Sequence, residues 1–203
     1  MHKHSLPVIL MFPILNSSLV AGVAEWEASV QGGPPTAGKY FLTDSGSAIS
    51  GNNPQVYDIG AYTGPRSFEF IVNAGNAGPS SALMGLAGQQ GLKFEQYSNT
   101  GHIGVTNFGV SDNDSDMPCP LNEDTQIVFT CDETDTLLYV NGVLKHTFAG
   151  LPLTLSGTVA LGAVSDESGS AYSDRLDGHI LGFAGYASVL APSVIAQHAA
   201  YQQ

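Results

Sequence analysis

The sequence predicts an all-β fold in which two antiparallel sheets pack as a sandwich, with one short helix near the C-terminal end. Composition supplies two of the reasons. The 203 residues include 24 glycines and 11 prolines, and only 12% of residues are charged while 43% are hydrophobic. Such a chain favours short strands joined by tight turns, because long surface helices need more Lys and Glu. Its length suits one well-buried core, so residues 25–203 are expected to form a single domain.

Short segments that alternate between apolar and polar residues supply the third reason. In residues 66–73, Phe68, Phe70 and Val72 are expected on one face, and Glu69 and Ile71 on the other. Similar segments between turn-rich stretches predict strands at residues 25–30, 39–43, 55–59, 81–87, 91–98 and 102–107. The next segment, residues 111–124, is predicted as a long polar loop.

The strongest local signal is Asn141-Gly142, between strands predicted at residues 136–140 and 143–148. A two-residue type I′ turn needs positive φ at both positions, which Asn and Gly tolerate best. The sequence therefore predicts a tight hairpin here.

The hairpin also predicts a register, in which Tyr139 faces Leu144 and Leu137 faces His146. Three of its residues are expected to share the core with Phe68 and Phe70: Tyr139, Leu144 and Phe148.

The remaining chain predicts strands at residues 125–131, 157–162 and 179–187, with a flexible polar loop at residues 165–175. Pro192 fits the first position of a helix, so the one helical segment is expected to begin there.

The charge of the chain excludes some partners. The formal net charge is −12, with only six Lys and Arg residues together. Phosphate recognition needs a basic face, so nucleic acid is excluded as a partner, and anionic membrane surfaces are disfavoured for the same reason.

The N-terminal residues 1–24 have the pattern of a secretory signal peptide. Lys3 precedes an uncharged run at residues 6–15, and the segment ends in small residues at Ala24. The apolar run is shorter than the ~20 residues that span a bilayer. We therefore expect a secreted, extracellular protein whose mature domain does not insert into a membrane.

The two cysteines, Cys119 and Cys131, suit an exported protein and could form a disulfide. The alternative is two buried thiols, and the spacing alone leaves both open.

Three motifs carry a family resemblance: Leu137-Leu-Tyr-Val-Asn-Gly142, Asp177-Gly178 leading into a strand, and Val189-Leu-Ala-Pro192 before the helix. In this order they resemble the laminin-G-like, concanavalin A-type jelly-roll modules. The resemblance implies a jelly-roll sandwich and an extracellular recognition domain, but it names no ligand. Leu181 and Gly182 stand where the family commonly has an acidic pair, which puts the family's calcium site near Asp177 in doubt.

A separate calcium candidate lies in the acidic segment after residue 111. Alternating carboxylates followed by a later glutamate echo the spacing of an EF-hand loop, although Met117 stands where that loop needs Gly. The candidate ligands are Asp112, Asp114, Asp116 and Glu123. The alternative is a solvated acidic turn.

Catalytic acids are not evident in the sequence. Concanavalin A-like glycoside hydrolases of the laminarinase type carry three acids at alternate positions of one strand, and no predicted strand here shows that pattern. A Gly-x-Ser-x-Gly motif is also missing. The sequence predicts no catalytic residue.

The hairpin at residues 92–107 is the best candidate for a ligand-binding face. A four-residue turn would place Tyr97 opposite His102, Glu95 opposite Gly104, and Lys93 opposite Thr106. One sheet face would then present an aromatic ring beside hydrogen-bonding groups, as sugars require. The predicted binding residues are Tyr97, His102, Glu95 and Thr106, and the alternative is an ordinary ladder of cross-strand pairs.

Three functions are therefore compatible with the sequence. The first is a non-catalytic recognition module for glycans or a cell-surface protein. The second is a structural or adhesive subunit of an extracellular or virion-type assembly. The third is a carbohydrate-active enzyme with relocated acids, which a groove holding two carboxylates ~5–9 Å apart would support.

Overall fold

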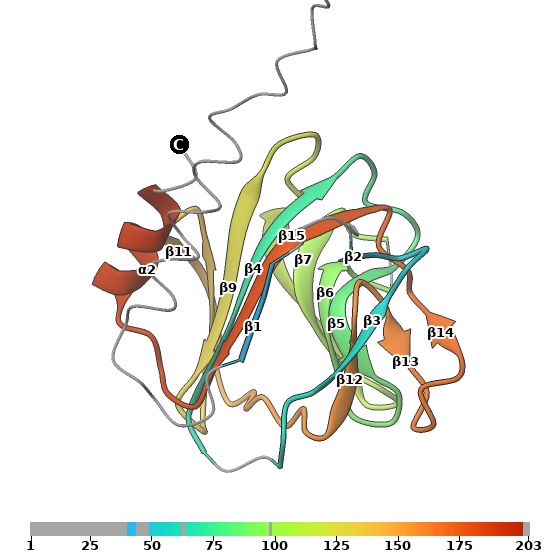
Figure 1. The fold of residues 1–203 in the computed structure, drawn as a ribbon. Coiled ribbons are helices and arrows are strands. Elements are labelled where there is room, and N and C mark those ends of the chain that lie inside the picture. The colour runs from blue at the N-terminus through green and yellow to red at the C-terminus, as the bar shows by residue number, and fades with distance from the viewer. Residues whose placement is uncertain (1–39, 44–48, 62–63, 98, 201–203) are drawn as a thin grey trace, which may run out of the picture.

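The computed structural model describes residues 40–43, 49–61, 64–97 and 99–200, and they form two facing β-sheets, as the sequence predicts (Figure 1). Sheet A contains, in spatial order, β1 (Tyr40–Thr43), β15 (Gly178–Tyr186), β4 (Arg66–Ala74), β9 (Thr125–Cys131), β10 (Thr136–Val140) and β11 (Val143–Phe148), and β2 (Ile49–Ser50) pairs with β15. All of its strand pairs are antiparallel.

Sheet B contains β14 (Tyr172–Ser173), β13 (Val164–Ser165), β5 (Ser81–Leu86), β6 (Gln90–Glu95), β7 (His102–Asn107) and β8 (Ser111–Pro118). Two further strands join it: β12 (Thr158–Leu161) pairs with β5, and β3 (Gln55–Asp58) pairs with β12. Only the pairing of β13 with β5 is parallel among the described strands of this sheet. The predicted strand at residues 25–30 and the segment 1–24 lie outside the described residues.

The core lies between the two sheets and follows the predicted alternation of β4. Phe68, Phe70 and Val72 are buried there, and the Phe70 and Phe183 ring centroids are 5.2 Å apart. Ile71 belongs to a second apolar cluster on the outer face of sheet A. That face is covered by helix α2 (Pro192–Ala200), which begins at the proline predicted for it (Figure 1). No helix among the described residues is long and apolar enough to span a membrane.

The β10–β11 hairpin confirms the predicted turn and corrects the predicted core. Asn141 and Gly142 have φ angles of 47° and 79°, and Tyr139 pairs with Leu144 as expected. Leu137, however, pairs with Thr147, because a β-bulge follows Leu138.

Lys145 is the extra residue of the bulge and has no pairing partner in the ladder. It reverses the alternation of faces, so residues before and after the bulge no longer follow the predicted pattern. The prediction of one shared face is therefore wrong. Phe148 faces the core, Tyr139 is buried in the outer cluster beneath α2, and Leu144 is exposed.

The predicted loop at residues 111–124 is also wrong for its first part, because Ser111–Pro118 is strand β8. This strand lies at the edge of sheet B and is almost entirely polar, so hydrophobic periodicity could not reveal it. Polar side chains support it: Asn113 Nδ2 donates to the Val105 carbonyl at 2.9 Å, and Ser115 Oγ donates to the Ile103 carbonyl at 2.5 Å.

The two cysteines are free thiols rather than a disulfide. Cys131 is buried in the core, where its sulfur accepts a hydrogen bond from the Leu153 amide at 3.2 Å. Cys119 donates to the Phe94 carbonyl at 2.8 Å, and burial, together with the charge of Glu95, raises its pKa to about 12. A thiol with so high a pKa is unreactive at neutral pH.

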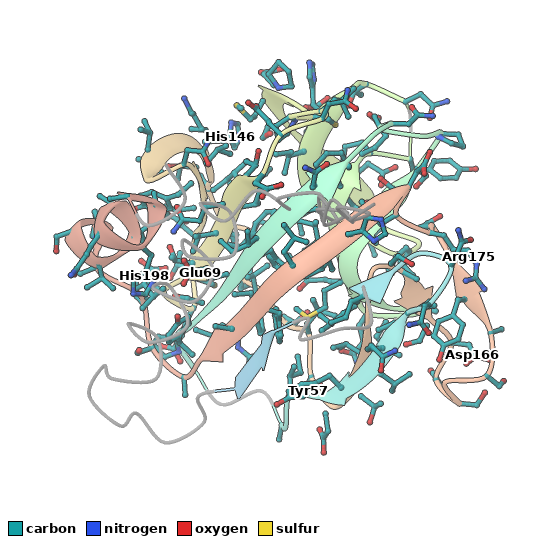
Figure 2. All side chains as sticks on the ribbon, turned by 45° about the horizontal axis from the view of Figure 1, so that its top comes forward. Tyr57, Glu69, His146, Asp166, Arg175 and His198 are labelled. Carbon is teal, nitrogen blue, oxygen red and sulfur yellow. The ribbon has the colours of Figure 1, made fainter. Side chains whose placement is uncertain are left out.

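A buried polar network fixes α2 to sheet A. The Glu69 carboxylate accepts hydrogen bonds from Gln126 Nε2 at 2.7 Å and from the Tyr186 hydroxyl at 2.9 Å, and His198 Nδ1 lies 2.9 Å from it. Figure 2 shows Glu69 and His198 close together where the helix meets the sheet. Burial, and then the charge of Glu69, raise the pKa of Tyr186 far above its usual range. The network satisfies a carboxylate that would otherwise be costly to bury.

We predict that Glu69→Ala lowers the free energy of unfolding by about 3 kcal/mol, because it leaves three buried polar groups without their shared partner. Chemical denaturation measures the change. Glu167→Ala, which removes an exposed carboxylate, serves as the control and should stay within about 0.5 kcal/mol of wild type. Equal effects of the two substitutions would contradict the role assigned to the network.

Candidate functional site

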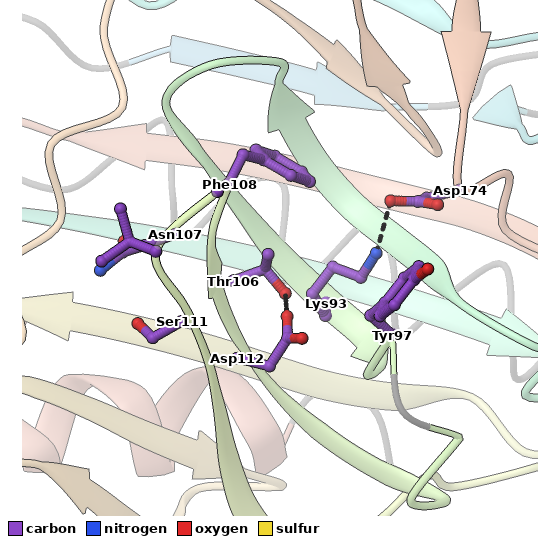
Figure 3. A pocket seen from close by; sticks show the side chains of 10 residues that line it. Lys93, Tyr97, Thr106, Asn107, Phe108, Ser111, Asp112 and Asp174 are labelled. Carbon is purple, nitrogen blue, oxygen red and sulfur yellow. Dashed lines mark hydrogen bonds and ion pairs between the residues drawn. The ribbon is translucent and has the colours of Figure 1, made fainter.

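A pocket of about 460 Å³ lies on the outer face of sheet B, facing away from the core (Figure 3). Its volume is within the ~300–1,000 Å³ common for small-ligand sites. The lining comes from β6, β7, β8, the connections that follow β6 and β7, and the segment that leads into β15: Lys93, Tyr97, Thr106, Asn107, Phe108, Gly109, Val110, Ser111, Asp112 and Asp174.

Lys93 lies at the back of the pocket and is fully buried. Its ammonium is 2.7 Å from Asp174 Oδ2 and donates to Ser80 Oγ at the same distance. Burial lowers the pKa of Lys93 from its usual value, and the hydrogen bond to Asp174 opposes that change. Asp174 therefore stabilises a charge that the sheet would otherwise bury unpaired.

The walls of the pocket combine apolar and polar groups. The Phe108 ring lies over Gly91, where a Cβ atom would come within 3.2 Å of Phe108 Cζ. On β7 and β8, Thr106 Oγ1 donates to Asp112 Oδ1 at 2.7 Å. Tyr97 is 71% exposed and Val110 82% exposed, so both are accessible to a ligand. The arrangement offers ring faces for stacking and carboxylates that can accept hydrogen bonds from hydroxyl groups.

The family model described as the concanavalin A-like lectin/glucanases superfamily matches residues 43–196. The chain belongs to this superfamily. No curated protein sequence matches the chain significantly.

Solved structures of low sequence identity share this concanavalin A-like fold. Domain 4 of the extracellular GH43 arabinanase AbnA from Geobacillus stearothermophilus, in complex with arabinotriose, has a TM-score of 0.59 and 13% identity, over 82% of this chain and 84% of that one. The CBM40 domain of the Ruminococcus gnavus IT-sialidase, bound to α2,3-sialyllactose, has a TM-score of 0.57 and 16% identity, over 78% and 98%. A heptameric SAP-like pentraxin from Limulus polyphemus has a TM-score of 0.55 and 11% identity, over 79% and 80%.

The structure of this concanavalin A-like domain brings only some of the predicted binding residues into the pocket. Tyr97 and Thr106 line it. Glu95 does not: it is buried, and its carboxylate accepts hydrogen bonds from the Gly101 amide at 3.0 Å and from the Cys119 thiol at 3.5 Å. His102 is bound instead to Asp114, with Nδ1 3.0 Å from Oδ1.

The predicted register of the β6–β7 hairpin is wrong by two residues, since Lys93 pairs with Gly104 and not with Thr106. Strand β6 ends at Glu95, and residues 96–101 form a longer connection than the predicted four-residue turn. The buried side chain of Gln96 fills the space above Gly104.

The predicted metal ligands are only partly brought together. Because residues 111–118 form a strand, no EF-hand-like loop exists there. The side chains that do converge are those of His102, Asp114 and Asp116, with one ligand atom from each within 4.8 Å of the others. Desolvation acts to raise the pKa of Asp114, but hydrogen bonds from the Asp116 amide and His102 outweigh it and hold that pKa below its usual value. Asp112 is bound to Thr106 instead.

Asp174 is the main site residue that the sequence did not reveal. It lies in the segment predicted as a flexible polar loop, 81 positions from Lys93. The loop is ordered by a turn in which Asp166 accepts hydrogen bonds from Ser168 and Ser170. No local pattern in the sequence indicates which strand such a loop will contact.

A second pocket, of about 350 Å³, lies near the junction of β2, β4 and β15. Arg175, Asp177 and His179 line it, with Asn52 and Asn73. The Arg175 guanidinium donates to the Gly51 carbonyl and lies 5.5 Å from the centre of the Tyr172 ring. Because the arginine already has these partners, this pocket is the weaker candidate.

We predict that Lys93 gives the domain a pH-dependent stability. Its lowered pKa means that the unfolded chain binds more protons than the folded protein between the folded-state pKa and about 10.5. The contribution of Lys93 to the free energy of unfolding therefore rises with pH between these two pKa values. The free energy of unfolding of wild type, relative to Lys93→Met, should increase as pH is raised from about 7 toward 10.5. A difference that stays constant or falls would show that burial does not dominate the titration of Lys93.

Proposed function

We propose that this domain is a secreted, non-catalytic recognition module that binds glycans in the pocket lined by Lys93, Tyr97 and Asp174. The observation that carries the proposal is the combination of an exposed aromatic ring and two carboxylates around one concavity on a rigid sheet. Carbohydrate is recognised by such groups, because a sugar has an apolar ring face and many hydroxyls. Export rests on the signal-like pattern of residues 1–24, and N-terminal sequencing of the protein from culture medium tests it.

The structural neighbours support a glycan ligand. AbnA domain 4 is in complex with arabinotriose, and the CBM40 domain is bound to sialyllactose. At 13% and 16% identity these neighbours share the fold with the chain, so the pocket itself has to support the choice of ligand site.

One observation favours the enzyme alternative: two carboxylates, Asp112 and Asp174, line the same pocket. Glycoside hydrolysis needs one carboxyl group that is protonated and can donate to the leaving oxygen. The Asp174 carboxylate already forms an ion pair with the Lys93 ammonium at 2.7 Å, and Asp112 already accepts a hydrogen bond from the Thr106 hydroxyl. This geometry suits binding better than acid catalysis.

We predict that Tyr97→Ala abolishes most glycan binding and leaves the melting temperature within a few degrees of wild type, because the exposed ring leaves no core cavity. Tyr97→Phe, which keeps the ring, is the matched control and should retain binding. A glycan array followed by calorimetry on the best ligand makes the measurement, and release of reducing sugar is assayed in parallel.

Retained binding by Tyr97→Ala would move the site away from this pocket. Loss of binding together with loss of folding would show that the ring is structural, and release of reducing sugar would favour the enzyme alternative.

A divalent cation remains a secondary proposal, now assigned to His102, Asp114 and Asp116. A site with an imidazole suits Zn²⁺ or Mn²⁺ better than Ca²⁺, which prefers oxygen ligands only. We predict that Asp114→Asn weakens Zn²⁺ binding about tenfold or more, whereas Asp112→Asn and Glu123→Gln leave it unchanged. Calorimetric titration measures these affinities. Equal losses of affinity in all three variants would favour the four carboxylates predicted from the sequence. If the wild-type protein gives no heat of binding, there is no cation site.

A further inference from the structure

The charges around the Lys93–Asp174 pocket carry information about the class of glycan. Among the lining residues that the structure describes, the ionisable groups are Lys93, Asp112, Asp174 and the Tyr97 phenol. Two carboxylates therefore face one ammonium, in a protein whose formal net charge is −12. An anionic ligand would enter a region of negative potential.

The ammonium of Lys93 is not available to attract such a ligand. Its side chain is fully buried, and two of the three donors of an ammonium group are used on Asp174 and Ser80. A ligand carboxylate that displaced Asp174 from its 2.7 Å contact with Lys93 would leave the Asp174 charge beside its own. The only positive charge that these residues supply is thus neutralised inside the protein.

The two carboxylates retain capacity for hydroxyl groups. An ionised carboxylate offers about four acceptor positions. Asp112 accepts one hydrogen bond from Thr106, and Asp174 accepts one from Lys93. Figure 3 shows both carboxylates beside the space that Tyr97 and Phe108 border. Vicinal hydroxyls of a sugar can donate to these oxygens while the sugar ring contacts the aromatic groups.

We propose that the pocket selects uncharged glycans with vicinal hydroxyls and rejects acidic glycans, such as sialylated or uronate-containing ones. The proposal rests on the proposed function, since it assumes that glycans bind in this pocket. Asp112 and Asp174 supply the selectivity and part of the affinity, because a carboxylate accepts hydrogen bonds from hydroxyls and repels a second carboxylate. The aromatic groups supply the rest of the affinity.

Matched pairs of glycans test the proposal. The probes are lactose-terminated glycans with their α2,3-sialylated forms, and a neutral galactan with polygalacturonate. We expect at least one neutral member to bind. Its acidic partner should bind at least about tenfold more weakly, since facing like charges are costly. Raising the salt concentration should reduce this difference in affinity, because salt screens the repulsion between the ligand and protein carboxylates.

A pair of variants locates the effect. Asp112→Asn keeps the size of the side chain and removes its charge, so it should weaken neutral binding and reduce the discrimination against the acidic partner. Asp58→Asn is the control, since it removes an exposed charge from β3, which does not line the pocket. It should leave both affinities unchanged.

The outcomes separate this proposal from the one on which it rests. If neutral and acidic members bind equally, or the acidic member binds more tightly and Lys93→Met abolishes that binding, glycan recognition stands and the selectivity is wrong. If no glycan of either class binds, the proposed function itself is wrong. Equal effects of Asp112→Asn and Asp58→Asn would assign any discrimination to the overall charge of the protein and not to the pocket.

Discussion

The ion pair between Lys93 and Asp174 is the interaction on which the outer face of sheet B depends. An ammonium buried on a central strand would be costly without a partner, and the partner comes from the segment between β14 and β15. The backbone supports the contact, since the Ala82 amide donates to the Asp174 carbonyl at 2.8 Å and Asp174 has a φ of 47°. The pair therefore fixes one wall of the pocket to the sheet that forms its floor.

Each sheet carries a buried charged group on its outer face, and the surroundings of the two groups differ. On sheet A, Glu69 is surrounded by Gln126, Tyr186 and His198 and is covered by helix α2. On sheet B, the Lys93–Asp174 pair borders a pocket that is open to solvent. The first arrangement stabilises the position of the helix, whereas the second leaves carboxylate oxygens accessible. This difference is why we assign recognition to sheet B.

The sequence predicts the elements that hydrophobic alternation and turn chemistry specify. It identifies β4 and its two faces, the Asn141-Gly142 turn and the start of α2 at Pro192. It misses β8 because an edge strand of polar residues has no apolar period.

Errors of register have a different origin. One extra residue makes the bulge after Leu138, and a connection longer than predicted shifts the β6–β7 register by two residues. Hydrophobic periodicity detects neither change. Of the predicted binding residues, Tyr97 and Thr106 line the pocket, and Glu95 and His102 do not. Asp174 could not be predicted, because its contact with Lys93 is set by the path of a distant loop.

We propose that the ligand binds on the outer face of sheet B, and a titration followed by nuclear magnetic resonance tests that placement directly. A ¹⁵N-labelled sample is titrated with the neutral glycan that binds best on the array, and the amide shifts are mapped on the structure. We expect the largest shifts at Tyr97, at residues 106–112 and at Asp174, all around the pocket on sheet B. Shifts confined to the second pocket at Arg175 and His179, or to the face that α2 covers, would contradict the account.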